Sequence, residues 1–409
     1  MRNIIKFEGS KSIIQRVLII SSFLKSPLRI INSSRCEDVQ TLIRNLTKLG
    51  FNFQEEGKSL IISPPQKVRN SQELFIQNSG TTLRLLLSRL SMMKDIQVSV
   101  DCSIQLKKRP IKPLLEILKK LEANINYQQF PIEINGKILN GGKIEIPADI
   151  SSQFISSILL VAPYFNTDLE LILKGKIVSR SYIKLTQKIM KDFGAESEFQ
   201  RNRIFVPANQ QYKNPEEYHI EPDFSSACYF WALGALSSNP IYTESSKKMK
   251  IQPDFQFLKI LSKMGAKIQR KPNYISVSKG NLVGIEIDMK DIPDQVPTLA
   301  VLSLFAESKT KIKNIHHLKY KESNRIFGLV KELQKIGCNI KYEKEVLLIH
   351  PLKKKPLKAK LHSYQDHRLV MAFYIFKTKF PYLTISDEQV VKKSYPDFFE
   401  DIKGLKLIS

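Results

Sequence analysis

The chain has 409 residues, of which 42% are hydrophobic and 25% charged, and its formal net charge is +25. This length allows two or three domains with their own cores, and no apolar stretch reaches the roughly eighteen residues that a membrane-spanning helix needs. The first nine residues lack the apolar region of a signal peptide, so we expect a cytoplasmic protein without membrane contacts. The four cysteines form no CxxC pair, which argues against a zinc site or a disulfide framework and predicts reduced thiols.

The positive charge is spread along the chain. The densest basic run, Lys353 to Lys360, contains no aromatic residues and lies between strand-like segments, which is typical of a solvated loop. Nucleic acid, a membrane surface or small anionic substrates could each account for such a charge. A basic nucleic-acid-binding repeat protein is therefore an alternative at this point, and salt-dependent retention on DNA would favour it.

A five-residue pattern, made of an apolar residue, two spacers, an apolar residue and usually Gly, recurs along the chain. Its last positions are residues 50, 122, 194, 265 and 337. Successive copies are 71 or 72 residues apart, and such a fixed period indicates a repeat architecture. Each copy closes an amphipathic helix and leads into an alternating stretch, for example residues 267–277 and 339–349, which we expect to be a strand. The predicted repeat is helix, turn and strand.

A second series with the same period consists of apolar runs of helical length. Six copies are present, beginning near Ser12, Thr81, Ser152, Ser226, Val296 and His367. These runs are apolar on nearly all sides, as in helices buried within a domain. We therefore expect an α/β (α+β) fold of two similar domains, each with three repeated helix and sheet units.

The repeat also predicts the domain boundaries. A break near residues 221–224 follows the third unit, and a first strand at residues 3–7 precedes the first full unit. We expect the two ends of the chain to complete one domain. The predicted domains are residues 10–221, and residues 1–9 together with 222–409, joined by two crossings that form a hinge.

The first three apolar helices begin with groups that suit an anion. The residues at these starts are Lys11, Ser12, Arg16, Asn78, Gly80, Arg84, Ser151, Ser152 and Gln153. Free backbone N–H groups at a helix N-terminus favour an anion, and neighbouring cations strengthen that preference. A simple helix cap uses the same residue types, so each motif alone leaves both interpretations open. Arg109, just before a helix expected at residues 113–121, can clamp a carboxylate or phosphate, or can be surface charge.

Lys321, Glu322 and Arg325 form the sharpest charged motif of the second half. On a helix beginning at Lys321, the two cations would share a face beside Glu322. A carboxylate among cations stays ionised and can transfer protons, although a surface ion-pair cluster is an alternative. Other candidates at helix starts or after the last strand are Asp294, His367, Arg368 and Lys393. Helix N-termini normally favour acidic residues, so the recurring cations indicate a shared anionic ligand.

The ordered set of motifs resembles the 5-enolpyruvylshikimate-3-phosphate (EPSP) synthase family over essentially the whole chain. The motifs are GSKS, NSGTTLR, KRPI, SSQF, VSRSY, IPD, KESNR, DHR and KKSYPDFF. The resemblance implies buried helices directed at an interdomain cleft and transfer of the enolpyruvyl group of phosphoenolpyruvate to the 5-hydroxyl of shikimate 3-phosphate. It also implies a monomer without cofactor or metal, with these small molecules and no nucleic acid as partners, and inhibition by glyphosate.

The same resemblance assigns residues. It implies that the catalytic residues are Asp294, Glu322, Lys11 and His367. Shikimate 3-phosphate would be bound by Lys11, Ser12, Arg16, Ser151, Ser152, Gln153, Ser179, Tyr182, Asp294, His317 and Lys321. Phosphoenolpyruvate would be bound by Lys11, Asn78, Gly80, Arg109, Gln153, Arg325, Arg368 and Lys393. The chain departs from the common pattern with His317 for Asn, Ser323-Asn324 for Thr-Asp, Arg180-Ser181 for Lys-Pro and Ser79 for Ala.

The nearest alternative is a UDP-N-acetylglucosamine enolpyruvyl transferase. That family shares the fold and the chemistry, and it carries a Cys shortly before an Arg-Pro. Cys102 precedes Arg109-Pro110 in this chain, but it lies further upstream than that pattern requires. The SSQ, KExxR and DHR motifs favour the shikimate enzyme.

Overall fold

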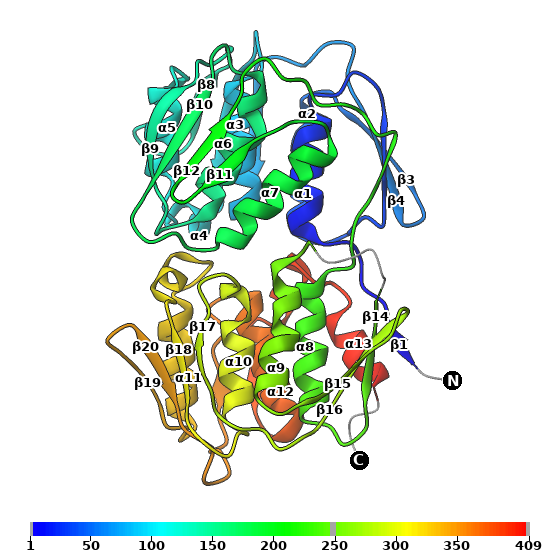
Figure 1. Cartoon of the computed structure of the whole chain (residues 1–409), viewed down its shortest axis with the longest axis vertical. Coiled ribbons are helices and arrows are strands. Elements are labelled where there is room, and N and C mark those ends of the chain that lie inside the picture. The colour runs from blue at the N-terminus through cyan, green and yellow to red at the C-terminus, as the bar shows by residue number, and fades with distance from the viewer. Residues whose placement is uncertain (1–2, 246–250, 406–409) are drawn as a thin grey trace. The chain divides into compact units, whose positions relative to one another are not determined.

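A computed structural model describes residues 3–245 and 251–405 (Figure 1). The chain divides into two compact units: the continuous unit, Glu8–Glu221, and the discontinuous unit, Met1–Phe7 with Pro222–Ser409. The chain passes from one unit to the other between residues 7 and 8 and again between residues 221 and 222. The N-terminal strand therefore belongs to the unit that the C-terminal half builds.

The continuous unit contains three four-stranded sheets. The first is ordered β13 (Glu217–His219), β2 (Leu28–Ile31), β4 (Ser59–Ser63) and β3 (Asn52–Glu56). The second is ordered β5 (Gln72–Ile76), β6 (Gln97–Cys102), β8 (Ile132–Asn135) and β7 (Asn124–Asn126). The third is ordered β9 (Gly142–Pro147), β10 (Leu169–Lys174), β12 (Arg203–Val206) and β11 (Glu198–Gln200).

Among the described residues, the discontinuous unit has two such sheets and one of two strands. The first is ordered β1 (Ile4–Ile5), β14 (Ile241–Glu244), β16 (Tyr274–Ser278) and β15 (Lys267–Arg270). The second is ordered β17 (Glu286–Asp288), β18 (Thr310–Lys313), β20 (Val346–Ile349) and β19 (Ile340–Glu343). The two-stranded sheet pairs β21 (Lys360–Leu361) with β22 (Thr384–Ile385).

All the four-stranded sheets share one plan: a parallel pair, whose inner strand pairs antiparallel with a hairpin. The prediction of one strand after each amphipathic helix was wrong, because residues 267–277 and 339–349 each hold the two strands of a hairpin. In the second hairpin, Lys344 and Glu345 have φ values of 48° and 61°, as a two-residue hairpin turn requires. Neither residue is the Gly or Asn that normally marks such a turn, so the sequence concealed it.

Two classes of helix alternate along the chain. The buried helices are α1 (Lys11–Ser21), α3 (Gly80–Ser91), α6 (Ser152–Val161), α8 (Phe224–Ala235), α10 (Val296–Ser303) and α12 (His367–Lys379). The amphipathic helices are α2 (Glu37–Lys48), α5 (Lys112–Lys120), α7 (Arg180–Asp192), α9 (Phe257–Lys263) and α11 (Arg325–Lys335). Shorter helices are α4 (Ile104–Lys107), α13 (Phe398–Gly404), η1 (Ala162–Tyr164), η2 (Pro253–Gln256), η3 (Pro293–Gln295), η4 (His316–Tyr320) and η5 (Glu388–Lys393). The predicted mixed fold of repeated helix and sheet units is thus confirmed.

The helix ends explain the five-residue pattern. The residue at its last position follows an amphipathic helix and takes the left-handed conformation, with φ of 104° at Gly50 and 87° at Gly337. Glu122 takes the same place with φ of 66°, although a left-handed residue at a helix end is usually Gly. Each copy leads into a hairpin. Among the described residues, the sheet of the sixth unit has only its parallel pair and no hairpin. This accounts for the count: the chain has six buried helices but only five copies of the pattern.

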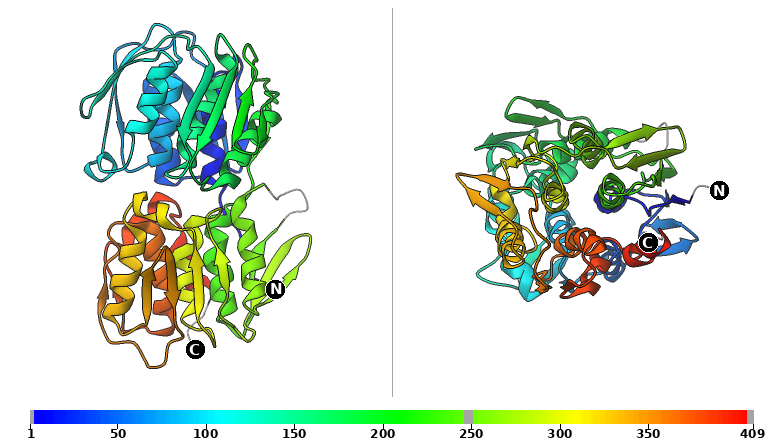
Figure 2. Two further views of the ribbon diagram at one scale, coloured as in Figure 1. Left: turned by 60° about the vertical axis from the view of Figure 1, so that its left-hand side comes forward. Right: turned by 90° about the horizontal axis from the view of Figure 1, so that it is seen from below.

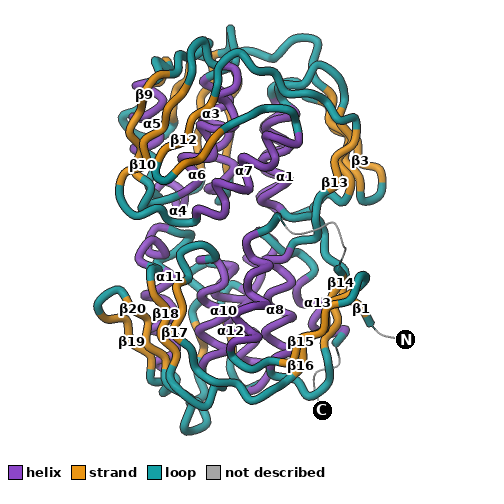
Figure 3. The backbone as a smooth tube through the Cα atoms, in the orientation of Figure 1, coloured by secondary structure: helices purple, strands orange, loops and turns teal. Residues whose placement is uncertain are grey.

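The buried helices form the core of each unit, and the sheets lie outside them (Figure 3). In the right view of Figure 2, α8, α10 and α12 are seen end-on in green, yellow and orange. Every residue of α8 is buried, and its Trp231 donates to Thr243 Oγ1 at 2.9 Å. Fully burying a large apolar side chain contributes about 1.5–3 kcal/mol. Packing therefore holds each of these helices firmly, with its N-terminus fixed in place.

Composition predicted three features: a basic loop, reduced thiols and the absence of a membrane-spanning helix. In the basic run Lys353–Lys360, residues 353–359 lie in a loop, as predicted, and Lys360 begins β21; all five lysines are exposed. Cys36, Cys102, Cys228 and Cys338 are all free and buried, in agreement with reduced thiols. In the described part of the chain, no helix combines the length and the apolar character needed to cross a membrane.

Candidate active site

In the continuous unit, amide side chains tie together the first turns of α1, α3 and α6. Gln15 Nε2 of α1 donates to Thr82 Oγ1 of α3 at 2.7 Å. Gln153 Nε2 of α6 donates to Thr81 Oγ1 at 2.8 Å, and Gln153 Oε1 accepts from Arg84 NH1 at 2.9 Å. These bonds gather the predicted residues at these helix starts at one end of the helix group: Lys11, Ser12, Asn78, Gly80, Ser151, Ser152 and Gln153.

Arg16 is a buried cation whose partners in the described structure are neutral. Its side chain donates to Thr186 Oγ1 at 2.7 Å, to the Ser12 carbonyl at 2.7 Å and to Ser156 Oγ at 3.4 Å. Burial lowers the pKa of the guanidinium to about 10, against a smaller opposing effect of Tyr182, so Arg16 stays charged at neutral pH. A buried charge is costly unless an opposite charge or several hydrogen bonds compensate it. Arg16 is therefore suited to an anionic ligand.

Lys11 opens α1 and pairs with a carboxylate that the sequence did not single out. Its Nζ lies 2.8 Å from Asp38 Oδ2, and the two side chains are 13% and 6% exposed. The first turn of α1 contains no acidic residue, and the positive end of a helix dipole disfavours a cation. Asp38 offsets this repulsion and holds the Lys11 ammonium at the helix start.

Two guanidinium groups flank Gly80. Arg84 NH1 donates to the Gly80 carbonyl at 3.0 Å, and its NH2 donates to the Pro110 carbonyl at 2.8 Å. A Cβ atom added at Gly80 would lie 2.4 Å from Arg109 NH1 and 2.5 Å from Arg84 NH1. The absence of a side chain at residue 80 thus lets both cations approach the start of α3, where an anion would be favoured.

Three further predicted residues lie at or beside helix starts of the continuous unit. Ser179, 5% exposed, is the N-cap of α7 with φ of 52°. Its carbonyl accepts from the Tyr182 backbone N–H at 3.0 Å. Asn78, just before α3, donates through Nδ2 to Gln105 Oε1 at 2.5 Å. Ser179 and Tyr182 thus lie at the start of the helix that also carries Thr186, the partner of Arg16.

In the discontinuous unit, Arg325 lies at the centre of a charged cluster. Its NH1 lies 2.8 Å from Asp294 Oδ1 and its NH2 lies 2.7 Å from Glu322 Oε2. Its Nε donates to Asp366 Oδ2 at 2.8 Å. The Arg325 side chain is 1% exposed and that of Asp366 is fully buried. Burial lowers the pKa of Arg325, but Asp366, Glu322 and Asp294 outweigh it and raise that pKa above its usual value.

Three more predicted residues lie on α12 or at the end of η5. Arg368 NH1 donates to the Tyr229 hydroxyl at 2.9 Å, and its NH2 lies 3.4 Å from Asp294 Oδ2. His367 Nδ1 lies 3.8 Å from Asp366 Oδ1. Lys393, in the last turn of η5, is 3% exposed. The cluster thus combines three carboxylates with several buried or half-buried cations.

The cations of the cluster hold Asp294 in its ionised form. Burial raises the pKa of Asp294, but Lys321, Arg368 and Arg325 together outweigh that effect and keep the pKa well below its usual value. Lys321 Nζ lies 3.6 Å from Asp294 Oδ1. Asp294 is therefore a carboxylate at neutral pH.

One local prediction about this cluster was wrong. The sequence suggested a helix beginning at Lys321, but α11 begins at Arg325. Asn324 is its N-cap, with Oδ1 accepting from the Phe327 backbone N–H at 3.1 Å. An Asn side chain that satisfies the helix N–H groups stops the helix there. Lys321 and Arg325 meet through Asp294 and not along one helix face.

His317 is a neutral imidazole packed near the same cluster. It is 1% exposed, and neither ring nitrogen has a hydrogen-bond partner among the described residues. Burial lowers its pKa to about 3, with further lowering by Lys321. Within the described structure, His317 thus keeps two buried ring nitrogens that are free to form hydrogen bonds.

The low pKa of His317 makes stability depend on pH. The unfolded chain takes up a proton at this residue below about pH 6.5, whereas the folded protein does not until about pH 3. Stability from this residue is therefore lost as the pH falls below about 6.5. Between pH 7 and pH 4, the free energy of unfolding of the wild type should fall more than that of His317→Asn, as measured by urea titration. Parallel curves for the two proteins would contradict this.

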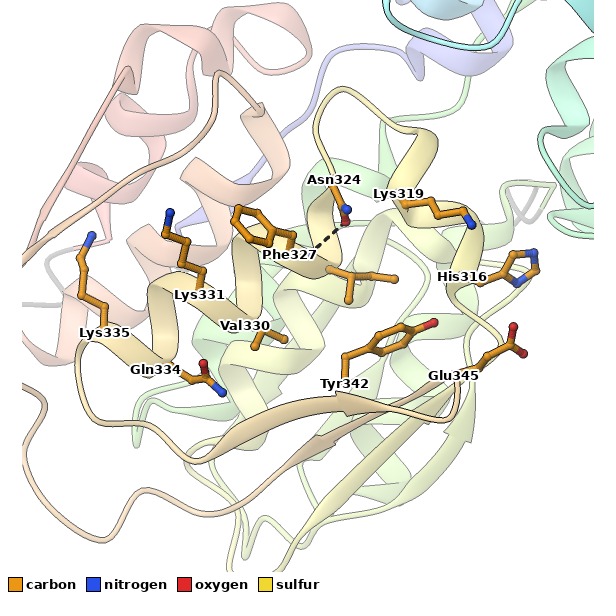
Figure 4. Close-up of a pocket in the computed structure, with 11 residues that line it drawn as sticks. His316, Lys319, Asn324, Phe327, Val330, Lys331, Gln334, Lys335, Tyr342 and Glu345 are labelled. Atoms are coloured by element: carbon orange, nitrogen blue, oxygen red, sulfur yellow. Dashed lines mark hydrogen bonds between the residues drawn. The ribbon is translucent and has the colours of Figure 1, made fainter.

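A groove of about 920 Å³ lies over a different face of α11, between this helix, η4 and β19 (Figure 4). The residues that line it include the apolar Phe327 and Val330, Tyr342, and the lysines Lys319 and Lys331. At 100° per residue, Phe327 and Val330 point away from the face that carries Arg325. None of the predicted site residues lines this groove, so it is separate from the charged cluster.

The sequence missed the residues that hold the predicted ones. Asp38 orients Lys11, and Gln15 holds the start of α3. Thr186 orients Arg16. Asp366 orients Arg325, and Tyr229 orients Arg368. Asp366 is the first residue of the DHR motif. Its position before a helix indicated a helix cap, and nothing in the sequence indicated its bond to Arg325. For the others, the only signal was a polar residue in a helix start or inside an apolar run.

Comparisons with known proteins give one family. The model of the EPSP synthase family, 3-phosphoshikimate 1-carboxyvinyltransferase, matches residues 1–402. A 3-phosphoshikimate 1-carboxyvinyltransferase of Buchnera aphidicola subsp. Cinara cedri is 36% identical over 98% of this chain and 94% of its own. One of Psychromonas ingrahamii is 33% identical over 98% and 96%. A solved EPSP synthase of Acinetobacter baumannii has a TM-score of 0.81 at 21% identity, over 98% of this chain and 95% of that one.

Proposed function

We propose a reaction for this chain on the premise that it belongs to the EPSP synthase family. The match over residues 1–402 and two relatives above 30% identity confirm the resemblance seen in its motifs. The chain is thus a 3-phosphoshikimate 1-carboxyvinyltransferase, an enzyme of the shikimate pathway and of aromatic amino acid biosynthesis. We infer that it transfers the enolpyruvyl group of phosphoenolpyruvate to the 5-hydroxyl of shikimate 3-phosphate and releases phosphate.

The observation that carries this proposal is the concentration of buried cations around helix N-termini. The two substrates bring two phosphates and two carboxylates, which need cations in fixed positions. We assign shikimate 3-phosphate to the region around Arg16, whose charge has only neutral partners in the described structure. Its contacts would include Ser12, Ser151, Ser152, Gln153, Ser179, Tyr182, His317 and Lys321.

Phosphoenolpyruvate suits the guanidinium groups. Arg109 lies next to Gly80 in the continuous unit, and Arg325 and Arg368 lie in the discontinuous unit, with Asn78 and Lys393 as further contacts. Arg368 Nε is buried and has no hydrogen-bond partner in the described part of the chain. A substrate carboxylate or phosphate would satisfy that donor. The proposal thus assigns phosphoenolpyruvate contacts to residues of both units.

The reaction proceeds by addition and elimination. The 5-hydroxyl oxygen bonds to C2 of phosphoenolpyruvate, its proton passes to a base, and C3 gains a proton to become a methyl group. The tetrahedral intermediate then loses a proton from that methyl group and loses phosphate from C2, which restores the double bond. We assign the base at the hydroxyl to Asp294, and proton transfer at C3 and at the leaving phosphate to Glu322 and Lys11. His367 would tune Glu322.

With its low pKa, Asp294 is too weak a base for this role until substrate is bound. Without substrate, Lys321, Arg368 and Arg325 stabilise the carboxylate, which makes it a weak base. Anionic substrates that take up the same cations would weaken this stabilisation and raise the basicity of Asp294. Substrate binding would thus prepare the base for the hydroxyl proton.

The decisive experiment measures phosphate release from phosphoenolpyruvate with either of two acceptors. We expect release with shikimate 3-phosphate and none with UDP-N-acetylglucosamine. The absence of release with the first acceptor would overturn the proposal. Cys102 also speaks against the second acceptor: it is 2% exposed, and burial raises the pKa of its thiol to about 12, so it is a poor nucleophile.

We expect glyphosate to inhibit this enzyme in competition with phosphoenolpyruvate. Gly80→Ala should weaken both ligands, because the added methyl group would lie within 2.5 Å of two guanidinium nitrogens. One methyl group in a binding pocket changes affinity by roughly 10-fold or more. Inhibition curves and the KM for phosphoenolpyruvate measure the effect. Gly404→Ala, where an added Cβ has no atom within 4 Å, serves as the control; unchanged inhibition in Gly80→Ala would contradict the assignment.

A further inference from the structure

Glu332 is a buried carboxylate on α11 that the proposed reaction does not use. Its side chain is 1% exposed. Its Oε1 accepts from the Tyr364 hydroxyl at 2.7 Å, and its Oε2 accepts from the His362 backbone N–H at 2.9 Å and from Lys335 Nζ at 2.5 Å. Burial raises the pKa of Glu332, but these hydrogen bonds outweigh it and lower the pKa below its usual value. Glu332 is thus an anion that holds the segment at residues 362–364.

The held segment has an unfavourable backbone. Tyr364 and Gln365 follow one another with φ values of 53° and 55°. A residue other than Gly in this conformation costs of order 1–3 kcal/mol and persists only where its surroundings fix it. The Tyr364 ring packs closely on α11, because a Cβ at Gly328 would lie 3.2 Å from Tyr364 Cδ2. Glu332 and Gly328 together dock this turn against α11.

The turn ends at Asp366, which orients Arg325. Asp366 accepts from Arg325 Nε at 2.8 Å and Arg325 NH2 at 3.3 Å. It also accepts from the Arg368 backbone N–H at 2.9 Å, and so caps α12. On α11, Glu332 lies seven residues after Arg325 and therefore on the same face. The contacts close a ring that runs from Arg325 along α11 to Glu332, across to Tyr364, and through Asp366 back to Arg325.

We propose that Glu332 is a positioning residue for phosphoenolpyruvate binding, acting through the 362–366 turn and Asp366 on the Arg325 guanidinium. The proposal rests on the function proposed above, which assigns Arg325 to phosphoenolpyruvate. A bidentate contact with a carboxylate or phosphate needs the guanidinium plane at a fixed angle. The ring of contacts fixes that plane, whereas most of the residues assigned to shikimate 3-phosphate lie in the continuous unit, outside the ring.

Two variants test the proposal from opposite sides of one hydrogen bond. Glu332→Gln removes the charge and keeps the shape, and Tyr364→Phe removes only the hydroxyl. We expect the KM for phosphoenolpyruvate to rise by roughly 10-fold in Glu332→Gln and roughly 3-fold in Tyr364→Phe, in line with the loss of one hydrogen bond to a charged group. The KM for shikimate 3-phosphate should change less than twofold. Steady-state kinetics with each substrate varied in turn give both constants.

Glu286→Gln is the control, since Glu286 is an exposed partner of Lys313 in the same unit. Thermal unfolding of all variants separates a loss of stability from a loss of affinity. A lower melting temperature with both KM values unchanged, or with both raised equally, would overturn the proposal. Tyr364→Phe keeps the test valid if Glu332→Gln does not fold. Absence of phosphate release in the wild type would instead defeat the proposed function.

Discussion

Glu322→Gln is expected to lower turnover by about 10²–10⁴-fold, the usual contribution of general acid–base catalysis. The amide has nearly the same shape, but it cannot carry a proton between C3 of phosphoenolpyruvate and the medium. Its oxygen can still accept a hydrogen bond from Arg325 NH2, which lies 2.7 Å from Glu322 Oε2. The fold and substrate binding should therefore survive. Rapid-quench or steady-state phosphate release under saturating substrates measures the loss.

The control for this variant is again Glu286→Gln, an exposed carboxylate in the same unit. It should leave turnover unchanged. Circular dichroism and thermal unfolding check that Glu322→Gln remains folded. A folded Glu322→Gln enzyme that turns over at a near-wild-type rate would remove Glu322 from the proton transfer.

Arg325→Met is expected to destabilise the protein by about 3–5 kcal/mol, the range for breaking a buried ion pair from one side. The change leaves Asp366, which is fully buried, without its main cation. It also removes a cation assigned to phosphoenolpyruvate, so the KM for that substrate should rise steeply. Urea unfolding measures the stability, and the comparison variant is Lys313→Met, which breaks an exposed pair worth only about 0–1 kcal/mol.

A second substitution separates the two effects of Arg325. In Arg325→Met combined with Asp366→Asn, the buried charge is gone while the amide still caps α12. The double variant should be less destabilised than the sum of the two single variants, since the residues interact directly. Its affinity for phosphoenolpyruvate should remain poor. Additive losses of stability would show that Asp366 and Arg325 are not coupled.

Sequence patterns sufficed for the features that repeat. The six buried helices follow from apolar runs, and the ends of the amphipathic helices follow from the Gly positions, since both depend on local periodicity and backbone conformation. The hairpin at residues 340–349 was missed because Lys344 and Glu345 supply its turn without Gly or Asn. The start of α11 was misplaced because the cap Asn324 was taken as part of the helix.

The sequence pointed to the charged candidates of the site and not to the residues that hold them. Lys11, Arg325 and Arg368 were visible because cations at helix starts run against the helix dipole. Their partners Asp38 and Tyr229 come from segments 27 and 139 residues away along the chain. Local patterns carry no information on such pairs, which only the packing of several helices creates.

The short strand β1 has a consequence for how the protein is made. It is synthesised before the continuous unit, yet it pairs with β14, which follows that unit: Ile4 lies opposite Tyr242 and Ile5 opposite Thr243. The continuous unit between them has all its own strands and can fold as soon as its last residues leave the ribosome. In the discontinuous unit, β1 cannot pair with β14 until β14 has been synthesised, after the whole continuous unit. We therefore expect vectorial assembly, with closure of the loop between β1 and β14 as a late and slow step.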